Sequence, residues 1–161
     1  MNRPSSLLSL IAFAALVCLP SLTTAQEKPA TPSTGYDEAM AQRVGADESG
    51  MRNYVLVVLK TGPTRVPDGP ERDEMFRAHF ANIQRLSKEG VLVHAGPLDG
   101  VDGWRGLFIF AVADIEEARK HVTTDPVVVR GEMVAEYHKH YGSAALMLMR
   151  DAHDKLAKKS L

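Results

Sequence analysis

The chain has 161 residues, of which 45% are hydrophobic and 24% are charged, and 19 basic residues against 20 acidic ones give a formal net charge of −1. Length and composition of this kind are typical of one globular domain. Because no basic excess is present to neutralise phosphates, the composition excludes a protein that binds nucleic acid through its overall charge. We therefore expect no nucleic-acid partner.

The first 25 residues have the pattern of a signal peptide. Arg3 supplies a positive start, an apolar run extends over residues 7–19, and residues 23–25 end in the small side chains that a signal peptidase accepts. We expect cleavage before Gln26 and a periplasmic or secreted protein. The apolar run is shorter than the roughly 20 residues that cross a bilayer, so we expect no stable membrane insertion after cleavage. The only cysteine, Cys18, would leave with this segment.

Residues 26–50 are predicted to be a flexible arm or linker. Proline, glycine and short polar residues dominate this stretch, which leaves little apolar surface to bury. Tyr36, Met40 and Val44 recur at a spacing of four, which is compatible with one short helix over 36–44.

The next part of the chain alternates between strand and helix patterns. Apolar runs rich in β-branched and aromatic residues predict strands at 54–59, 91–95, 106–112 and 133–141. Helical spacing of apolar residues predicts helices at 71–89, at 115–122 after the capping residue Asp114, after Asp125-Pro126 as a short turn, and at 144–159.

This order of elements predicts an α+β fold. The core sequence βαββαβ is that of the ferredoxin-like split βαβ unit, an antiparallel sheet with its helices on one face. Residues 54–59 and 107–110 are apolar on both alternating faces, which indicates that the second face of the sheet is also covered. A second copy of the chain is the simplest cover, so we expect a homodimer.

Several motifs in this order resemble one known family, the YciI-like (YCII-related) proteins. The resemblance covers about residues 47–146, and we place the domain at 51–146, with residues 147–161 as a helical tail. The motifs are Met51-Arg52-Asn53-Tyr54-Val55, His79, Glu89-Gly90, Ala95-Gly96-Pro97-Leu98, Arg105-Gly106, Glu116-Glu117-Ala118, Thr124-Asp125-Pro126 and Tyr141-Gly142-Ser143-Ala144-Ala145-Leu146.

The resemblance implies a dimeric α+β barrel with a His–Asp pair in a cleft. Matched to this chain, the pair is His79 and Asp125. Some relatives resemble dehydrochlorinases that act on chlorinated aromatic breakdown products. Two residues depart from the pattern, since His94 and His140 stand where the family usually has apolar or aromatic side chains.

The residues of this pair also have structural interpretations. His79 lies between Phe76 and Phe80 on the helix face that should meet the sheet, so it is either a base or a core-edge histidine that bonds a backbone carbonyl. Asp125 before Pro126 is either a helix N-cap or the carboxylate that orients the imidazole, and one side chain can do both.

Four further residues are candidates for substrate binding. Arg105 has the planar guanidinium that clamps carboxylates, and His138 and His140 point to one face of their strand. His138 and His140 are interpreted as polar strand residues that line a cleft, and His94 is a further candidate on the edge strand away from the final strand. Two histidines on one strand are fewer than the three protein ligands of a typical catalytic zinc, so we expect no metal site.

Two hypotheses for the function follow. The chain has no glycine-rich phosphate loop, no nucleophile elbow and, once processed, no cysteine nucleophile. The first hypothesis is a cofactor-free acid–base enzyme of lyase or isomerase type, in which His79 and Asp125 act on a small organic molecule. A dehydrochlorinase-like reaction is one form of this hypothesis. The second is a non-catalytic periplasmic domain that binds a small ligand or has an accessory role.

Overall fold

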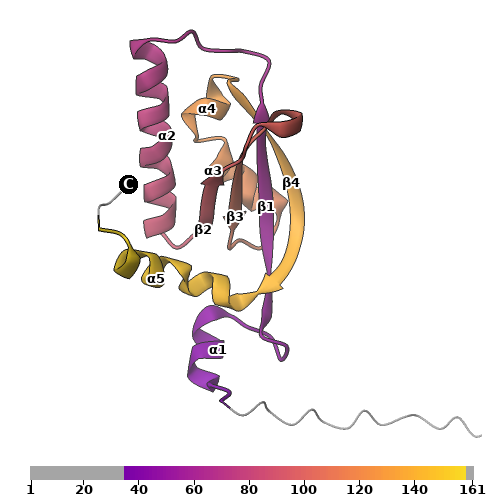
Figure 1. Cartoon of the computed structure of the whole chain (residues 1–161). Coiled ribbons are helices and arrows are strands. Elements are labelled where there is room, and N and C mark those ends of the chain that lie inside the picture. The colour runs from indigo at the N-terminus through magenta and orange to yellow at the C-terminus, as the bar shows by residue number, and fades with distance from the viewer. Residues whose placement is uncertain (1–34, 159–161) are drawn as a thin grey trace, which may run out of the picture. The chain divides into compact units, whose positions relative to one another are not determined.

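The computed structural model describes residues 35–158 (Figure 1). The predicted signal peptide, 1–25, and residues 26–34 of the predicted arm lie outside the described residues. The elements discussed below all belong to the unit Tyr36–Leu161. No helix in this part of the chain is both long enough and apolar enough to span a membrane.

Four antiparallel strands form one sheet. They are β1 (Met51–Thr61), β2 (Leu92–Pro97), β3 (Trp104–Phe110) and β4 (Met133–Ser143). Their spatial order is β2-β3-β1-β4, which places β1 and β3 in the centre. β1 pairs with β4 along its whole length, from Met51 opposite Ser143 to Thr61 opposite Met133. The predicted antiparallel α+β architecture with the order βαββαβ is confirmed.

The helices that connect the strands begin and end at residues typical of helix termini. They are α2 (Pro70–Lys88), α3 (Ile115–Val122) and the single turn α4 (Pro126–Val129). Pro70 occupies the first turn of α2, where its missing N–H costs nothing. Asp114 caps α3 by accepting from the Glu117 N–H at 2.9 Å. Gly90 ends the run after α2 with φ of +73°, a left-handed conformation that glycine adopts without strain.

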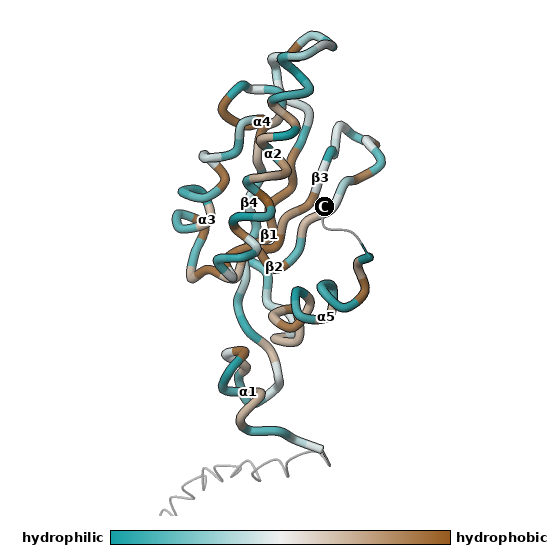
Figure 2. Tube along the Cα trace, turned by 90° about the vertical axis from the view of Figure 1, so that its left-hand side faces the viewer, coloured by the Kyte–Doolittle hydropathy of each residue, from teal (hydrophilic) through white to brown (hydrophobic). Residues whose placement is uncertain are grey.

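The helices cover one face of the sheet. The buried core on that face joins Val55, Val57 and Leu59 of β1 to residues of the other strands and the helices, namely Leu92, Phe108, Phe110, Met75, Leu86, Ala118, Val122, Val127 and Met133. Figure 2 shows apolar residues concentrated along β1. Alternation along a strand explains this core, because residues two apart point to the same face.

The second face of the sheet is mixed rather than apolar. Tyr54 and Val58 are already buried within one protomer, although the neighbouring strand β4 contributes polar residues to this face. Those residues are Glu136, His138 and His140, which pair with Val58, Leu56 and Tyr54. The burial of these two residues therefore does not need a second copy of the chain, and the homodimer stays a prediction.

The described part of residues 26–50 contains the helix α1 (Glu38–Val44). The Arg52 guanidinium donates to the carbonyl of Val44 at 2.7 Å. The Tyr141 hydroxyl of β4 bonds the Asp47 carboxylate, which also accepts from the N–H groups of Ser49 and Met51. Residues 38–50 are thus tied to the ends of β1 and β4.

The predicted helix at 144–159 is shorter and of two kinds. A 3₁₀ segment, η2 (Ala144–Leu148), precedes α5 (Met149–Leu156), and a second short 3₁₀ turn, η1 (Val101–Gly103), joins β2 to β3. The Ser143 hydroxyl accepts from the Ala145 N–H at 3.2 Å and holds the tighter first turn. No residue of α5 is buried, so the apolar stripe that predicted this helix packs little surface.

Candidate active site

His79 lies on the face of α2 that meets the sheet. Its ring is surrounded by three phenylalanines: Phe108 of β3 stacks on it at a centroid distance of 6.1 Å, Phe76 meets it edge-on at 6.1 Å, and Phe80 lies at 5.3 Å. Only 8% of the residue is exposed. Helical spacing places Phe76 and Phe80 within one turn of His79, so the aromatic surroundings follow from the sequence of α2 and from one central strand.

Asp125 lies at the start of α4 and is 0% exposed. Its Oδ1 atom accepts from the Val127 N–H at 3.1 Å, which is the N-cap contact predicted for an aspartate before Pro126. Both carboxylate oxygens also lie 2.8 Å from Nδ1 of His79. The carboxylate therefore caps the helix and contacts the imidazole, so the two interpretations given to Asp125 describe one geometry.

The contact assigns the proton on the imidazole. A carboxylate oxygen only accepts, so Nδ1 carries a proton, and in the neutral ring Nε2 holds the free electron pair. The two nitrogens lie on different edges of the ring, and Nε2 therefore faces away from Asp125. An imidazole held in this tautomer has the state that a general base requires.

Arg105 lies in a different cluster, around a buried acid. Its guanidinium is 3.9 Å from Oε1 of Glu132, and Arg72 of α2 binds the same oxygen at 2.8 Å. Glu132 is 2% exposed and accepts from the Val66 N–H at 2.8 Å. Burial acts to raise the pKa of Glu132, but the Val66 N–H and the Arg72 guanidinium outweigh it and hold this pKa below its usual range.

The structure does not bring Arg105 to the His–Asp pair. No hydrogen bond or ion pair joins Arg105 to His79 or Asp125 among residues 35–158. A link through other groups exists, because the Arg72 guanidinium lies 4.9 Å from the ring centroid of Phe76, which in turn packs on His79.

Two of the other three predicted binding residues, His138 and His140, lie on the face of the sheet away from the helices. His94 pairs with Ile109, while His138 and His140 pair with Leu56 and Tyr54. His79 packs on Phe108, which belongs to the helix-covered core. Within one protomer the sheet thus separates His138 and His140 from the pair, whereas His94 lines a groove between α2, the edge strand β2 and α5, and the binding roles of these histidines stay predictions.

The YCII-related domain model matches residues 51–138, which is more than half of the chain. The chain belongs to the YCII-related domain family. The resemblance stated from the sequence motifs is confirmed by this match. No curated protein matches the chain.

Eight chains of solved structures match this YCII-related protein. One is the 5-chloro-2-hydroxyhydroquinone dehydrochlorinase TftG of Burkholderia phenoliruptrix AC1100, in complex with 2,5-dihydroxybenzoquinone. It is 19% identical, the match covers 54% of this chain and 90% of that chain, and the TM-score is 0.39. A similarity of this extent does not transfer an activity or a substrate to this chain.

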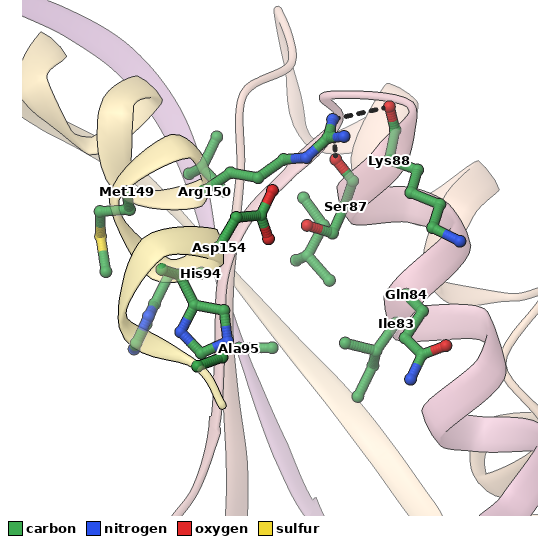
Figure 3. Close-up of a pocket in the computed structure, with 13 residues that line it drawn as sticks. Ile83, Gln84, Ser87, Lys88, His94, Ala95, Met149, Arg150 and Asp154 are labelled. Carbon is green, nitrogen blue, oxygen red and sulfur yellow. Dashed lines mark hydrogen bonds between the residues drawn. The ribbon is translucent and has the colours of Figure 1, made fainter. Parts of the chain in front are cut away.

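A groove of about 600 Å³ opens beside the YCII-related domain, and Figure 3 shows it. Its walls are the last turns of α2, the edge strand β2 and α5, and α5 lies beyond the matched residues. Ile83 and Gln84 point from α2 towards the groove, while Arg150 of α5 reaches the carbonyls of Ser87 and Lys88 at 3.3 and 3.0 Å (Figure 3). His94 lines this groove, whereas neither His79 nor Asp125 does.

The burial of Glu132 escaped the sequence patterns. Glu132 follows a glycine and precedes a strand, a position typical of a solvated turn, and its burial depends on Arg72 sixty residues earlier. The available signal was the position of Arg72, four residues before Phe76 on the sheet-facing side of α2. Within residues 35–158, no group of three or more histidine, cysteine or acidic side chains is arranged to hold a metal ion.

Proposed function

We propose that this YCII-related protein is an exported acid–base enzyme of lyase or isomerase type that acts on a small organic molecule without a cofactor. The observation that carries the proposal is the contact between Nδ1 of His79 and both oxygens of Asp125 at 2.8 Å, made inside an aromatic and almost dry environment. A positioned imidazole contributes about 100-fold to 10,000-fold to reactions of this kind.

The chemistry follows from the different roles of the two imidazole nitrogens. Nε2 takes a proton from the substrate, and Asp125 stabilises the positive charge that then forms on the ring. The electron pair of the broken bond forms a new double bond. In an isomerisation the same proton returns to another substrate atom. In a dehydrochlorination chloride leaves with the electron pair of its bond to carbon, and the proton passes to water.

Chloride release is the direct test. The probe is 5-chloro-2-hydroxyhydroquinone, and free chloride is measured with purified mature protein and with His79→Ala and Asp125→Asn. We expect turnover that both variants lower by about 100-fold or more. His121→Ala is the matched control, because His121 is also a helix histidine stacked on a phenylalanine, Phe110, at 6.1 Å. A His79→Ala enzyme as active as the His121→Ala enzyme overturns the proposal.

A second candidate function is supported by the groove. The groove is lined by neither member of the His–Asp pair, which is the arrangement expected of a non-catalytic domain that holds a small ligand. Chloride release and solvent-hydrogen exchange that stay at the level of the buffer, together with saturable binding in the groove, favour this candidate over the enzyme.

A further inference from the structure

The groove between α2, β2 and α5 lies against the elements that hold His79. Ile83, which lines it, comes one helical turn after His79 on α2. Ala95, which also lines it, pairs with Phe108, and the Phe108 ring stacks on His79. The groove therefore begins next to the imidazole, although it does not contain it.

The free nitrogen of His79 lies on the edge of the ring opposite Asp125. Asp125 approaches His79 from α4, which packs against α2 and β4, and β4 is the strand at the far edge of the sheet from β2. Because Nδ1 is directed to Asp125, Nε2 is directed away from α4. We propose, on the basis of the function proposed above, that the groove binds the substrate and that the substrate reaches Nε2 from the end formed by Ile83 and Ala95.

The lining indicates the class of substrate. At the end next to His79 the walls are apolar, with Ile83 and Ala95. At the other end two cations, Lys88 and Arg150, line the groove against the single carboxylate of Asp154. About 13 Å of helix separates His79 from Lys88. This pattern fits an elongated organic anion whose apolar end meets His79 and whose anionic group lies near Lys88.

The third wall belongs to this chain rather than to the matched domain. The family match ends at residue 138, while α5 comprises Met149–Leu156. Arg150 fixes α5 by donating to two carbonyls at the end of α2, where a helix lacks internal donors. The tail thus converts an open sheet edge into a walled site and selects the substrate.

Binding of a matched pair of probes tests this proposal. The anion is 4-phenylbutyrate and its neutral counterpart is 4-phenylbutanol, each titrated into the ¹⁵N-labelled mature protein. For the anion we expect amide shifts at Ile83 and Ala95 and a shift of the His79 ring nitrogens. We also expect binding at least tenfold tighter than that of the alcohol. Equal affinities, or shifts that leave Ile83 and Ala95 unchanged, overturn the proposal.

Variants locate the site independently. Ala95→Leu fills the end next to His79 and Lys88→Glu reverses the charge at the other end, and each is expected to weaken anion binding at least tenfold. Ala81→Leu on the exposed side of α2 and Lys139→Glu on β4 are the controls, and neither should change the affinity. Unchanged binding in Ala95→Leu and Lys88→Glu refutes the groove, whereas chloride release that survives His79→Ala refutes the enzyme and leaves the groove standing.

Discussion

Asp125 makes two contacts with one carboxylate, so its replacement by alanine and by asparagine should have separable effects. Asp125→Ala removes the acceptor for the Val127 N–H and the acceptor for Nδ1 of His79. Asp125→Asn keeps one oxygen for the helix cap and places an amide NH₂ where the second oxygen was. That NH₂ can donate to Nδ1 only if the imidazole proton moves to Nε2.

The structure sets the size of each effect. Loss of the N-cap costs about 1 kcal/mol, and a buried imidazole N–H without an acceptor costs about 1–3 kcal/mol. Asp125→Ala should therefore lower the free energy of unfolding by about 2–4 kcal/mol. Asp125→Asn keeps the cap and replaces one hydrogen bond by another, so its loss should stay near 1 kcal/mol. Both variants should lose activity, the asparagine variant because Nε2 is then protonated and no longer accepts.

Two measurements examine this reasoning. Urea unfolding followed by circular dichroism gives the stabilities, and ¹⁵N NMR of the His79 ring shows which nitrogen carries the proton. The expected order of stability is wild type, then Asp125→Asn, then Asp125→Ala, with the proton on Nδ1 in the wild type and on Nε2 in Asp125→Asn. Equal stabilities of the two variants, or a proton that stays on Nδ1 in Asp125→Asn, would show that the carboxylate does not have this double role.

Four other predictions concern the rest of the molecule. Because the pKa of Glu132 is lower in the folded chain than in the unfolded one, Glu132→Gln should cost about 2–3 kcal/mol at pH 7, and in urea unfolding this difference should shrink as the pH falls below the ordinary value of 4.5 and through the lower pKa of the folded chain. A Cβ at Gly142 would lie 2.6 Å from Nε2 of His140, so Gly142→Ala should lower stability by about 1 kcal/mol, and the cost should fall in a His140→Ala background. Light scattering should give twice the mass of the mature chain, and a monomer at micromolar concentration contradicts the dimer. The intact mass of protein recovered from the cell envelope should correspond to a chain that begins at Gln26, whereas retention of Met1 contradicts export.

The strands could be predicted because each buried strand is a short run of consecutive apolar residues. Residues 54–59 are apolar at every position, and the structure places them in β1, a central strand. Asp125 was predictable as a cap because capping depends on neighbours two or three residues away. In each case the cause of the structure lies within a few residues, which is the range that periodicity and turn chemistry can detect.

The arrangement of the candidate site depends on longer distances. Local patterns placed His79 on a sheet-facing helix, but its partner is 46 residues away, and only the family resemblance connected the two. The sides of His94, His138 and His140 follow from strand register, and the histidines themselves carry no sign of it. The exposed α5 shows a second limit of local patterns. An apolar stripe predicts a helix but does not show that another element packs against that stripe.

The full-length pairing of β1 with β4 sets when this domain can fold. β1 is the first strand of the domain and lies in the centre of the sheet, yet one of its two neighbours is completed only at Ser143. Such long-range pairing is slow to form, and during synthesis it waits until most of the chain has emerged. Until then β1 has an unpaired edge and the nascent chain stays open. The export proposed above would use that state, because a secretion channel that threads an extended polypeptide needs a precursor that has not yet folded.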